Sequence, residues 1–222
     1  MQQDILFSEL LGAFAGDGWI SRGNSGYSLF ITGNPKDERE YYLRIKYLFL
    51  KKFGLTVKPR EFPYWKTYGV SVTNQAIIRR FMSVGMPSGK KASIVKVPDF
   101  IQKNARYFTP FIRGVFDTDG SIYFEKSYNK NASKWQKTHH HMPVVSFVTT
   151  SECLSISLFG MLASLGFNFS RKKRAPAKIG KFPSYRLRLK GKANVHMFFD
   201  DIRPENTRHL SKFKMWLEEG FY

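Results

Sequence analysis

The first half of the chain alternates between two hydrophobic patterns, one with the period of an amphipathic helix and one with the period of a half-buried strand. Their order predicts helix, two strands, helix, two strands, helix. Residues 23–26 form a turn signal between the first two strands, Gly54 follows the second helix, and Asn74 is suited to cap the third. The helices are expected at residues 5–17, 37–53 and 75–82, and the last two strands at residues 57–60 and 67–73.

The second half predicts the same order of elements, after a connecting segment at residues 86–107 that prolines and glycine interrupt. A further helix is expected at residues 209–221. The strands of this half are expected at residues 121–126, 144–149, 169–174 and 185–190, and its later helices at residues 152–165 and 192–199.

Two nine-residue segments share one pattern. They are LLGAFAGDG at residues 10–18 and IRGVFDTDG at residues 112–120, and each predicts a mostly apolar helix that ends in Asp-Gly. Asp119 follows Asp17 by 102 residues. Such a pair, followed by elements in the same order, indicates a duplicated unit.

The duplication continues downstream, where three residues of the first half match three of the second. Tyr68 and Phe81 are separated by 13 residues, as are Tyr185 and Phe198, and Gly54 matches Gly166. We therefore predict a first repeat at residues 1–88, a linker at residues 89–107 and a second repeat at residues 108–222. About ten extra residues of the second repeat are expected within residues 126–142.

Net charge is the bulk property that says most about the binding partner. Lys and Arg number 36 against 17 Asp and Glu, which gives a formal net charge of +19, while 42% of the residues are hydrophobic. A folded domain with this excess repels itself, and a polyanion such as DNA or RNA relieves that repulsion. No long basic amphipathic helix is evident, so no membrane partner is expected.

The single cysteine, Cys153, excludes a disulfide within the chain and fits a reducing compartment. No apolar run approaches the roughly 20 residues that span a bilayer, and the first residues lack the basic opening of a signal peptide. We expect a soluble intracellular protein, in the cytoplasm of a prokaryote or in an organelle.

Small residues suggest how the two motif helices meet. Gly12 and Gly16 lie four residues apart, as do Gly114 and Thr118, and this spacing lets two helix backbones approach closely. Asp17 and Asp119 would then lie a few ångströms apart at equivalent ends of the seam. Asp117 is expected to be structural, because Ala15 occupies the equivalent position.

Two carboxylates at the negative ends of two helices need a counterion. A divalent cation such as Mg²⁺ or Mn²⁺ meets this need, because it takes oxygen ligands and activates water for attack on a phosphodiester. We expect Asp17 and Asp119 to bind it, joined by the carbonyl oxygens of Gly16 and Thr118.

At these motifs the chain resembles the LAGLIDADG homing endonucleases in their single-chain, two-repeat form. The second motif fits well, whereas the first has Ala15-Gly16 where the family name spells Asp-Ala. The resemblance implies an α+β fold of two pseudo-symmetric αββαββα repeats, each with a curved antiparallel sheet, that form a saddle over double-stranded DNA.

The resemblance also implies an activity, a Mg²⁺-dependent double-strand break at a long and nearly asymmetric site. It implies that Asp17 and Asp119 bind the metal and that a lysine after the first repeat assists catalysis. Lys90 and Lys91 both fit, and we favour Lys91.

Strand alternation predicts the side chains that would contact DNA. Arg186, Arg188 and Lys190 share one face with no acid between them, whereas the matching face of the first half has Gly69, Ser71 and Thr73. The target should therefore not be a palindrome. The full set of candidates is Ser28, Thr32, Lys58, Arg60, Ser71, Thr73, Tyr123, Glu125, Lys172, Arg174, Arg186, Arg188 and Lys190.

Two other functions remain open. An RNA-binding intron maturase would take intron RNA as its partner, and a DNA-binding regulator would bind without cutting. The short distance from Met1 to the first motif favours an intron-encoded or free-standing gene over an intein, and a monomer is expected. No Walker phosphate loop, dinucleotide fingerprint or zinc-ligand spacing is present in the sequence.

Overall fold

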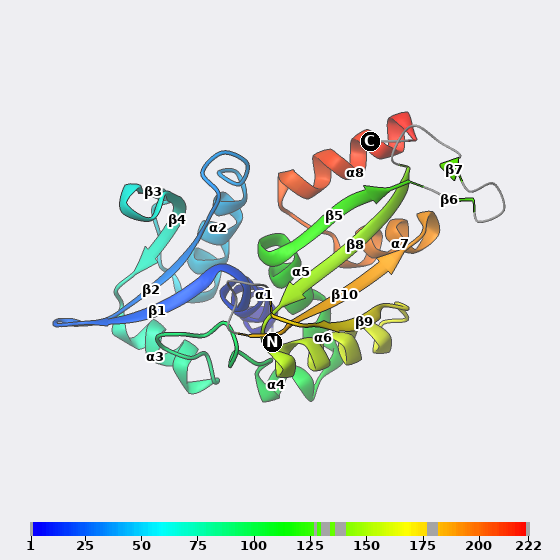
Figure 1. The fold of residues 1–222 in the computed structure, drawn as a ribbon. Coiled ribbons are helices and arrows are strands. Elements are labelled where there is room, and N and C mark those ends of the chain that lie inside the picture. The colour runs from blue at the N-terminus through cyan, green and yellow to red at the C-terminus, as the bar shows by residue number, and fades with distance from the viewer. Residues whose placement is uncertain (1, 127, 130–133, 136–140, 177–181, 221–222) are drawn as a thin grey trace.

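Two four-stranded antiparallel sheets flank a central pair of helices in the computed structural model of the chain (Figure 1). The structure describes residues 2–126, 128–129, 134–135, 141–176 and 182–220. The central helices are α1 (Gln2–Asp17) and α5 (Phe108–Asp119). They are the two motif helices, and they make the most extensive contact between any two elements of the described structure.

The first half follows the predicted order of elements. Asn74 caps α3 as expected, because its side chain accepts hydrogen bonds from the backbone N–H groups of Ala76 and Ile77. Gly54 ends α2 in the left-handed conformation, also as expected. After α1 come β1 (Gly18–Gly23), β2 (Gly26–Gly33), α2 (Tyr41–Phe53), β3 (Arg60–Phe62), the 3₁₀ turn η1 (Pro63–Trp65), β4 (Thr67–Val72) and α3 (Gln75–Ser83).

Two boundaries in this half differ from the prediction. The strand expected at residues 57–60 begins only at Arg60, because Pro59 has no N–H to donate to the sheet. The helix expected from residue 37 begins at Tyr41. The preceding loop is held by polar side chains instead: Lys36 N–H donates to Asn34 Oδ1, and Asn34 N–H donates to Glu38 Oε2.

The second half repeats this order and adds to it. The connecting segment, expected as a loop, contains the short helix α4 (Asp99–Gln102) and the 3₁₀ turn η2 (Ala105–Tyr107). Within residues 126–142 the structure describes a two-stranded hairpin, and the remainder of that stretch lies outside the described residues. After α5 come β5 (Gly120–Glu125), β6 (Tyr128–Asn129), β7 (Lys134–Trp135), β8 (Met142–Thr149), α6 (Glu152–Ser164), β9 (Ser170–Arg174), β10 (Ser184–Lys190), α7 (Lys192–Ile202) and α8 (Thr207–Glu219).

Strand order and register show that the halves are repeats. The first sheet has the order β1-β2-β4-β3 and the second β5-β8-β10-β9. Gly18 pairs with Ile31 in the first sheet, and Gly120 pairs with Phe147 in the second. Both halves therefore have the αββαββα order, and α8 follows the second as an addition. The predicted fold class is confirmed.

Glycines at the seam allow the central helices to touch. A Cβ atom on Gly12 would overlap the carbonyl oxygen of Phe111, and one on Gly114 would overlap that of Glu9. One on Gly16 would overlap the Thr118 hydroxyl. The small residues that the sequence singled out therefore pack backbone against backbone.

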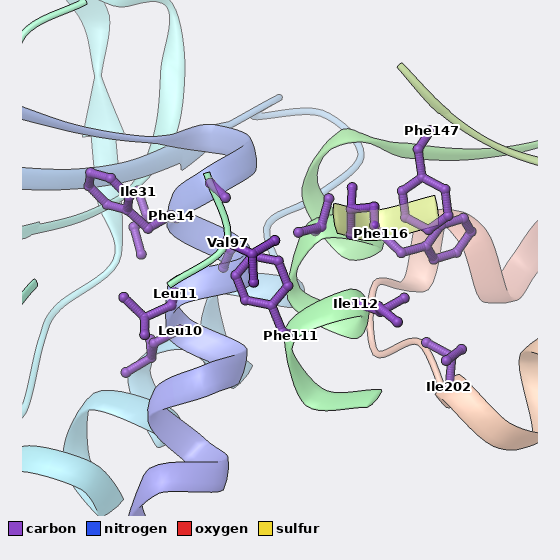
Figure 2. Close-up of a cluster of buried hydrophobic side chains, with 14 of the residues drawn as sticks. Leu10, Leu11, Phe14, Ile31, Val97, Phe111, Ile112, Phe116, Phe147 and Ile202 are labelled. Atoms are coloured by element: carbon purple, nitrogen blue, oxygen red, sulfur yellow. The ribbon is translucent and has the colours of Figure 1, made fainter. Parts of the chain in front are cut away.

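The hydrophobic core runs through both halves. Figure 2 shows Val97 and Phe111 between the two central helices, while Phe116 lies near Phe147 of the second sheet. Helices cover only one side of each sheet, since alternate residues such as Leu29 and Ile31 are buried against them. We call the opposite side of each sheet its open face. Across the described ranges, no helix is long and apolar enough to cross a membrane.

Candidate active site

The two aspartates that end the central helices lie close together, where Asp17 is partly buried and Asp119 reaches the surface. Asp17 is the last residue of α1 and Asp119 the last of α5. Burial, together with the negative charges of Asp119 and Glu38, raises the pKa of Asp17 to about 7. The pKa of Asp119 is also raised, by burial and by the charge of Glu38. Carboxylates held in this way favour a cation beside them.

Lys91 supplies one positive charge to this region. Its Nζ donates a hydrogen bond of 2.6 Å to the Ala15 carbonyl oxygen and another to that of Gly16, at the end of α1. Burial lowers the Lys91 pKa to about 8, although the charges of Asp119 and Asp17 oppose the shift. Lys90, the other lysine that the sequence left open, is exposed.

Arg208 supplies a second positive charge, and the sequence reasoning missed it. Its Nη2 lies 3.4 Å from the carbonyl oxygens of both Thr118 and Gly120, at the end of α5. Arg208 follows Lys91 by 117 residues, which is also the separation of Tyr68 from Tyr185. The two cations therefore occupy equivalent positions, each beside the end of its own repeat's central helix. The constant offset was the signal that could have revealed Arg208.

Glu38 is a third acid at this site, and it too was missed. It is buried, with 3% of its surface exposed, and its Oε1 lies 2.7 Å from Arg208 Nη1. A Cβ atom on Gly33 would overlap the Glu38 carboxylate and lie 3.1 Å from Asp17 Oδ2, so the two carboxylates border one small space. The sequence placed Glu38 within the helix expected at residues 37–53, whereas it lies in the loop before α2, so nothing in the sequence pointed to it.

Asp117 has the structural role that was expected of it. Its carboxylate accepts hydrogen bonds of 3.0–3.1 Å from the backbone N–H groups of Glu205 and Asn206. Burial raises its pKa to about 7, and these hydrogen bonds oppose the rise. Asp117 thereby fixes the turn that begins α8 and so helps to place Arg208.

A cavity of about 300 Å³ opens beside the aspartates, lined by Gly16, Lys91, Asp119 and the end of β8. Its donor set suits a hard divalent cation, because carboxylate and carbonyl oxygens converge there. The Gly16 and Thr118 carbonyls already lie within reach of Lys91 and Arg208, but each oxygen keeps a second lone pair. Among the described residues, no three His, Cys, Asp or Glu side chains are placed to hold a metal ion together, so a cation here would rest on two carboxylates and backbone oxygens.

Comparison with known proteins identifies the fold. A family model described as a LAGLIDADG-like domain matches residues 109–203. A structure of variants of the homing endonuclease I-DmoI is similar to this chain with a TM-score of 0.61 at 13% identity, over 92% of this chain and 99% of that one. Residues 109–203 therefore match a LAGLIDADG-like domain, and the whole chain has the fold of I-DmoI.

Other LAGLIDADG structures are similar to nearly the same extent. I-DmoI in complex with DNA and Mn gives a TM-score of 0.59 at 14% identity, over 90% of this chain and 97% of that one. The N-terminal LAGLIDADG domain of WhiA gives 0.56 at 13% identity, over 91% of this chain and 83% of that one. At these identities the likeness establishes the fold. Among curated proteins, none matches the chain significantly.

The DNA-contact candidates of the second half line the open face of its sheet. Tyr123 and Glu125 alternate with the buried Ile122 and Phe124 of β5. Strand register adds Lys172, Arg174, Arg186, Arg188 and Lys190 to the same face.

An acid from a different strand, β5, lies among these cations. Glu125 pairs with Lys190 at 2.6 Å and also with Arg188. Glu125 is 63 and 65 residues away in the chain but near them across the sheet.

The candidates of the first half are more scattered. Ser28 and Ser71 lie on the open face of the first sheet, and Arg60 Nη2 donates a hydrogen bond of 3.3 Å to Ser71 Oγ. Thr73 is exposed just beyond β4. Two expectations need correction: Thr32 is on that face but only 5% exposed, and Lys58 is exposed but precedes β3, which begins after Pro59.

Proposed function

We propose that this protein is a site-specific DNA endonuclease that makes a double-strand break at a long asymmetric site. The observation that carries the proposal is the site at the helix ends, where Asp17 and Asp119 lie together with Lys91 and Arg208. Acids with raised pKa values beside cations are typical of a reaction centre. The net charge of +19 supports a nucleic acid as the substrate.

The cofactor in this proposal is Mg²⁺ or another divalent cation such as Mn²⁺. Asp17 and Asp119 would hold it, with the carbonyl oxygens of Gly16 and Thr118. A cation bound there would supply a Lewis acid that stabilises negative charge on the phosphate and makes a nearby water a better nucleophile.

The side chains of the protein would perform the remaining tasks. Lys91 and Arg208 would each place a positive charge beside one scissile phosphate, where negative charge increases as water attacks and the leaving oxygen departs. The donors of Lys91 are already fixed by the α1 carbonyls and those of Arg208 by Glu38, so little reorganisation is needed. We propose catalytic roles for Asp17, Asp119, Lys91 and Arg208.

The proposed domain organisation follows the duplication: a first repeat at residues 1–88, a linker at residues 89–107 and a second repeat at residues 108–222. Each repeat would place its open face against half of the target. Apart from the buried Thr32, the candidate contact residues of both halves are proposed to bind DNA. The chain is proposed to act as a monomer, since both halves of the site are in one polypeptide.

Binding without cutting is a second candidate function, either as an RNA-binding intron maturase or as a DNA regulator. The cationic open face of the second sheet favours it, because binding through Arg186 or Lys172 needs neither aspartate. Double-stranded DNA and intron RNA are therefore both candidate partners to test.

A cleavage assay tests the proposal. Purified protein with Mg²⁺ is incubated with a library of DNA duplexes, alongside Asp17→Asn, Asp119→Asn and the control Asp201→Asn, whose side chain is exposed and remote in sequence from both motifs. We expect cutting at one long site by the wild type and the control, and none by the two site variants, which should still bind. Specific binding without cutting by the wild type would contradict the nuclease and support the second candidate.

A further inference from the structure

An aromatic cluster covers the open face of the first sheet. Trp19 of β1 pairs with Phe30 of β2, and Phe62 of β3 pairs with Thr67 of β4. The register puts Trp19, Phe30 and Phe62 on the side opposite the buried Leu29 and Ile31. These aromatic side chains are therefore not part of the core between the sheet and its helices.

Trp65, from the turn η1, completes the cluster. Its ring centroid lies 5.1 Å from Trp19, 5.2 Å from Phe30 and 5.6 Å from Phe62. Trp19 and Phe30 stack with centroids 4.8 Å apart. Trp65 is 44% exposed and its neighbour Tyr64 92% exposed, so the cluster presents a large aromatic surface to the outside.

The equivalent positions of the second sheet are polar. Ser121 pairs with Ser146 where Trp19 pairs with Phe30, and Arg174 stands where the first sheet has Phe62. Several polar atoms on that second face have no hydrogen-bond partner among the described residues, including Ser146 Oγ, Arg186 Nε and Arg188 Nε. One repeat therefore offers rings where the other offers polar and cationic side chains.

Resting on the proposed function, we propose that the first sheet recognises its half of the target through apolar contact with thymine 5-methyl groups in the major groove. The methyl group of thymine is the apolar group that base pairs present in that groove, and aromatic side chains suit it, whereas Arg suits guanine. The second sheet, with Arg186, Arg188 and Arg174, recognises the other half by polar contacts. The two half-sites thus differ in chemistry as well as in sequence.

The electrostatics of the first face fit this division of labour. Its cation Arg60 lies over the ring of Phe62, 4.9 Å from the centroid, and also donates to Ser71. That guanidinium thus already has partners within the sheet. DNA against this face would cover apolar surface that is otherwise hydrated, and the gain from that burial scales with the number of methyl groups in contact.

Replacement of thymine by uracil tests the proposal, because it removes only the methyl group. Sequences bound by the intact protein are first selected from a random duplex pool. In the selected duplex, thymines of one half-site at a time are then replaced by uracil. We expect affinity to fall about fourfold for each contacted methyl group in the half bound by the first sheet, with little change in the other half.

Two variants show which half-site lies against the aromatic cluster. Trp65→Ala should weaken binding and abolish the uracil effect, while Arg174→Ala should weaken binding and leave that effect intact. Thermal unfolding of both variants establishes that they are folded. The uracil comparison on the wild type alone does not depend on either variant.

The outcomes separate this inference from the function on which it rests. Specific duplex binding with equal or no sensitivity to uracil in both halves would overturn the inference alone. A uracil effect that persists in folded Trp65→Ala would do the same. If no duplex is selected at all, the proposed function fails and the inference falls with it.

Discussion

Arg208 and Glu38 form an ion pair of 2.7 Å that joins α8, at the end of the second repeat, to a loop of the first. The pair fixes a guanidinium beside both aspartates. Lys91, at the equivalent position of the first repeat, is held instead by the backbone carbonyls of Ala15 and Gly16. The two halves of the site are thus equivalent in position but different in chemistry, which leads to the first expectation.

Lys91 and Arg208 should each serve one DNA strand. Each lies beside a different helix end, so removal of one charge should slow one cut more than the other. We expect Lys91→Met and Arg208→Met each to lower the rate on one strand by about 10²–10³ and to convert supercoiled plasmid with the target into nicked circles. Strand-specific end labels should show opposite strands protected. Equal slowing of both strands in both variants would refute the assignment.

Removal of the Asp17 charge should stabilise the protein in the absence of metal. The folded-state pKa of about 7 exceeds the ordinary 3.8, so between these values the folded protein keeps a proton that the unfolded chain has lost. Its unfolding free energy therefore falls as pH rises through this window. Asp17→Asn should raise the unfolding free energy by about 1–3 kcal/mol near pH 8 and change it little near pH 4.

Metal should reverse that ranking. Saturating Mg²⁺ stabilises whichever protein binds it, by an amount that grows with the ratio of metal concentration to dissociation constant. Thermal unfolding with Mg²⁺ or with chelator, on the wild type and Asp17→Asn, measures both effects. A variant less stable than the wild type near pH 8 with chelator would contradict the role of burial at Asp17.

His209 should make the protein sensitive to acid. Its side chain is buried against Phe116, and burial lowers its pKa from 6.5 to about 3. The unfolded chain therefore binds a proton in this interval that the folded protein does not, and stability is lost as pH falls below 6.5. The contribution is about 1.4 kcal/mol per pH unit. His209→Phe should flatten denaturant-measured stability over this range, and an unchanged pH slope would argue against it.

The seam between the central helices should not tolerate a side chain. A Cβ atom on Gly114 would overlap the Glu9 carbonyl oxygen and lie 2.6 Å from Ala13 N, and both are backbone atoms that cannot rotate away. Gly114→Ala should cost about 3 kcal/mol or more. The control Gly160→Ala, in the middle of α6 with no atom within 4 Å, should instead stabilise by about 1 kcal/mol. Urea unfolding of both variants tests the contrast.

The open face of β9 should account for part of the salt dependence of DNA binding. Lys172 and Arg174 point to that face, whereas Lys173 lies over Tyr185 on the other side. We expect Lys172→Ala and Arg174→Ala each to reduce the slope of log affinity against log salt by about 1. The control Lys173→Ala should leave the slope nearly unchanged, and an equal reduction in all three would show that β9 attracts DNA by charge alone.

Local chemistry explains why so much of the fold could be predicted. Hydrophobic periodicity gave most helices and strands, and residues such as Asn74 and Gly54 ended them where capping requires. Element boundaries were misplaced where a single residue interrupts the pattern, as Pro59 does before β3. The internal duplication predicted the pairing of Asp17 with Asp119. The same motif ends the equivalent helix of each repeat, so the two aspartates occupy equivalent positions.

The sequence by itself determined the duplication, the order of elements, the two helix-end aspartates and the positive charge that points to a polyanion. Each of these properties depends either on residues near one another in the sequence or on a sum over all residues. Only the tertiary structure decided that Glu38 and Arg208 join the aspartates, that Glu125 pairs with Arg188, and that Trp65 lies over Trp19 and Phe30. Those contacts depend on strand register and helix packing across long separations, and burial, which shifts the pKa values, exists only once the chain has folded.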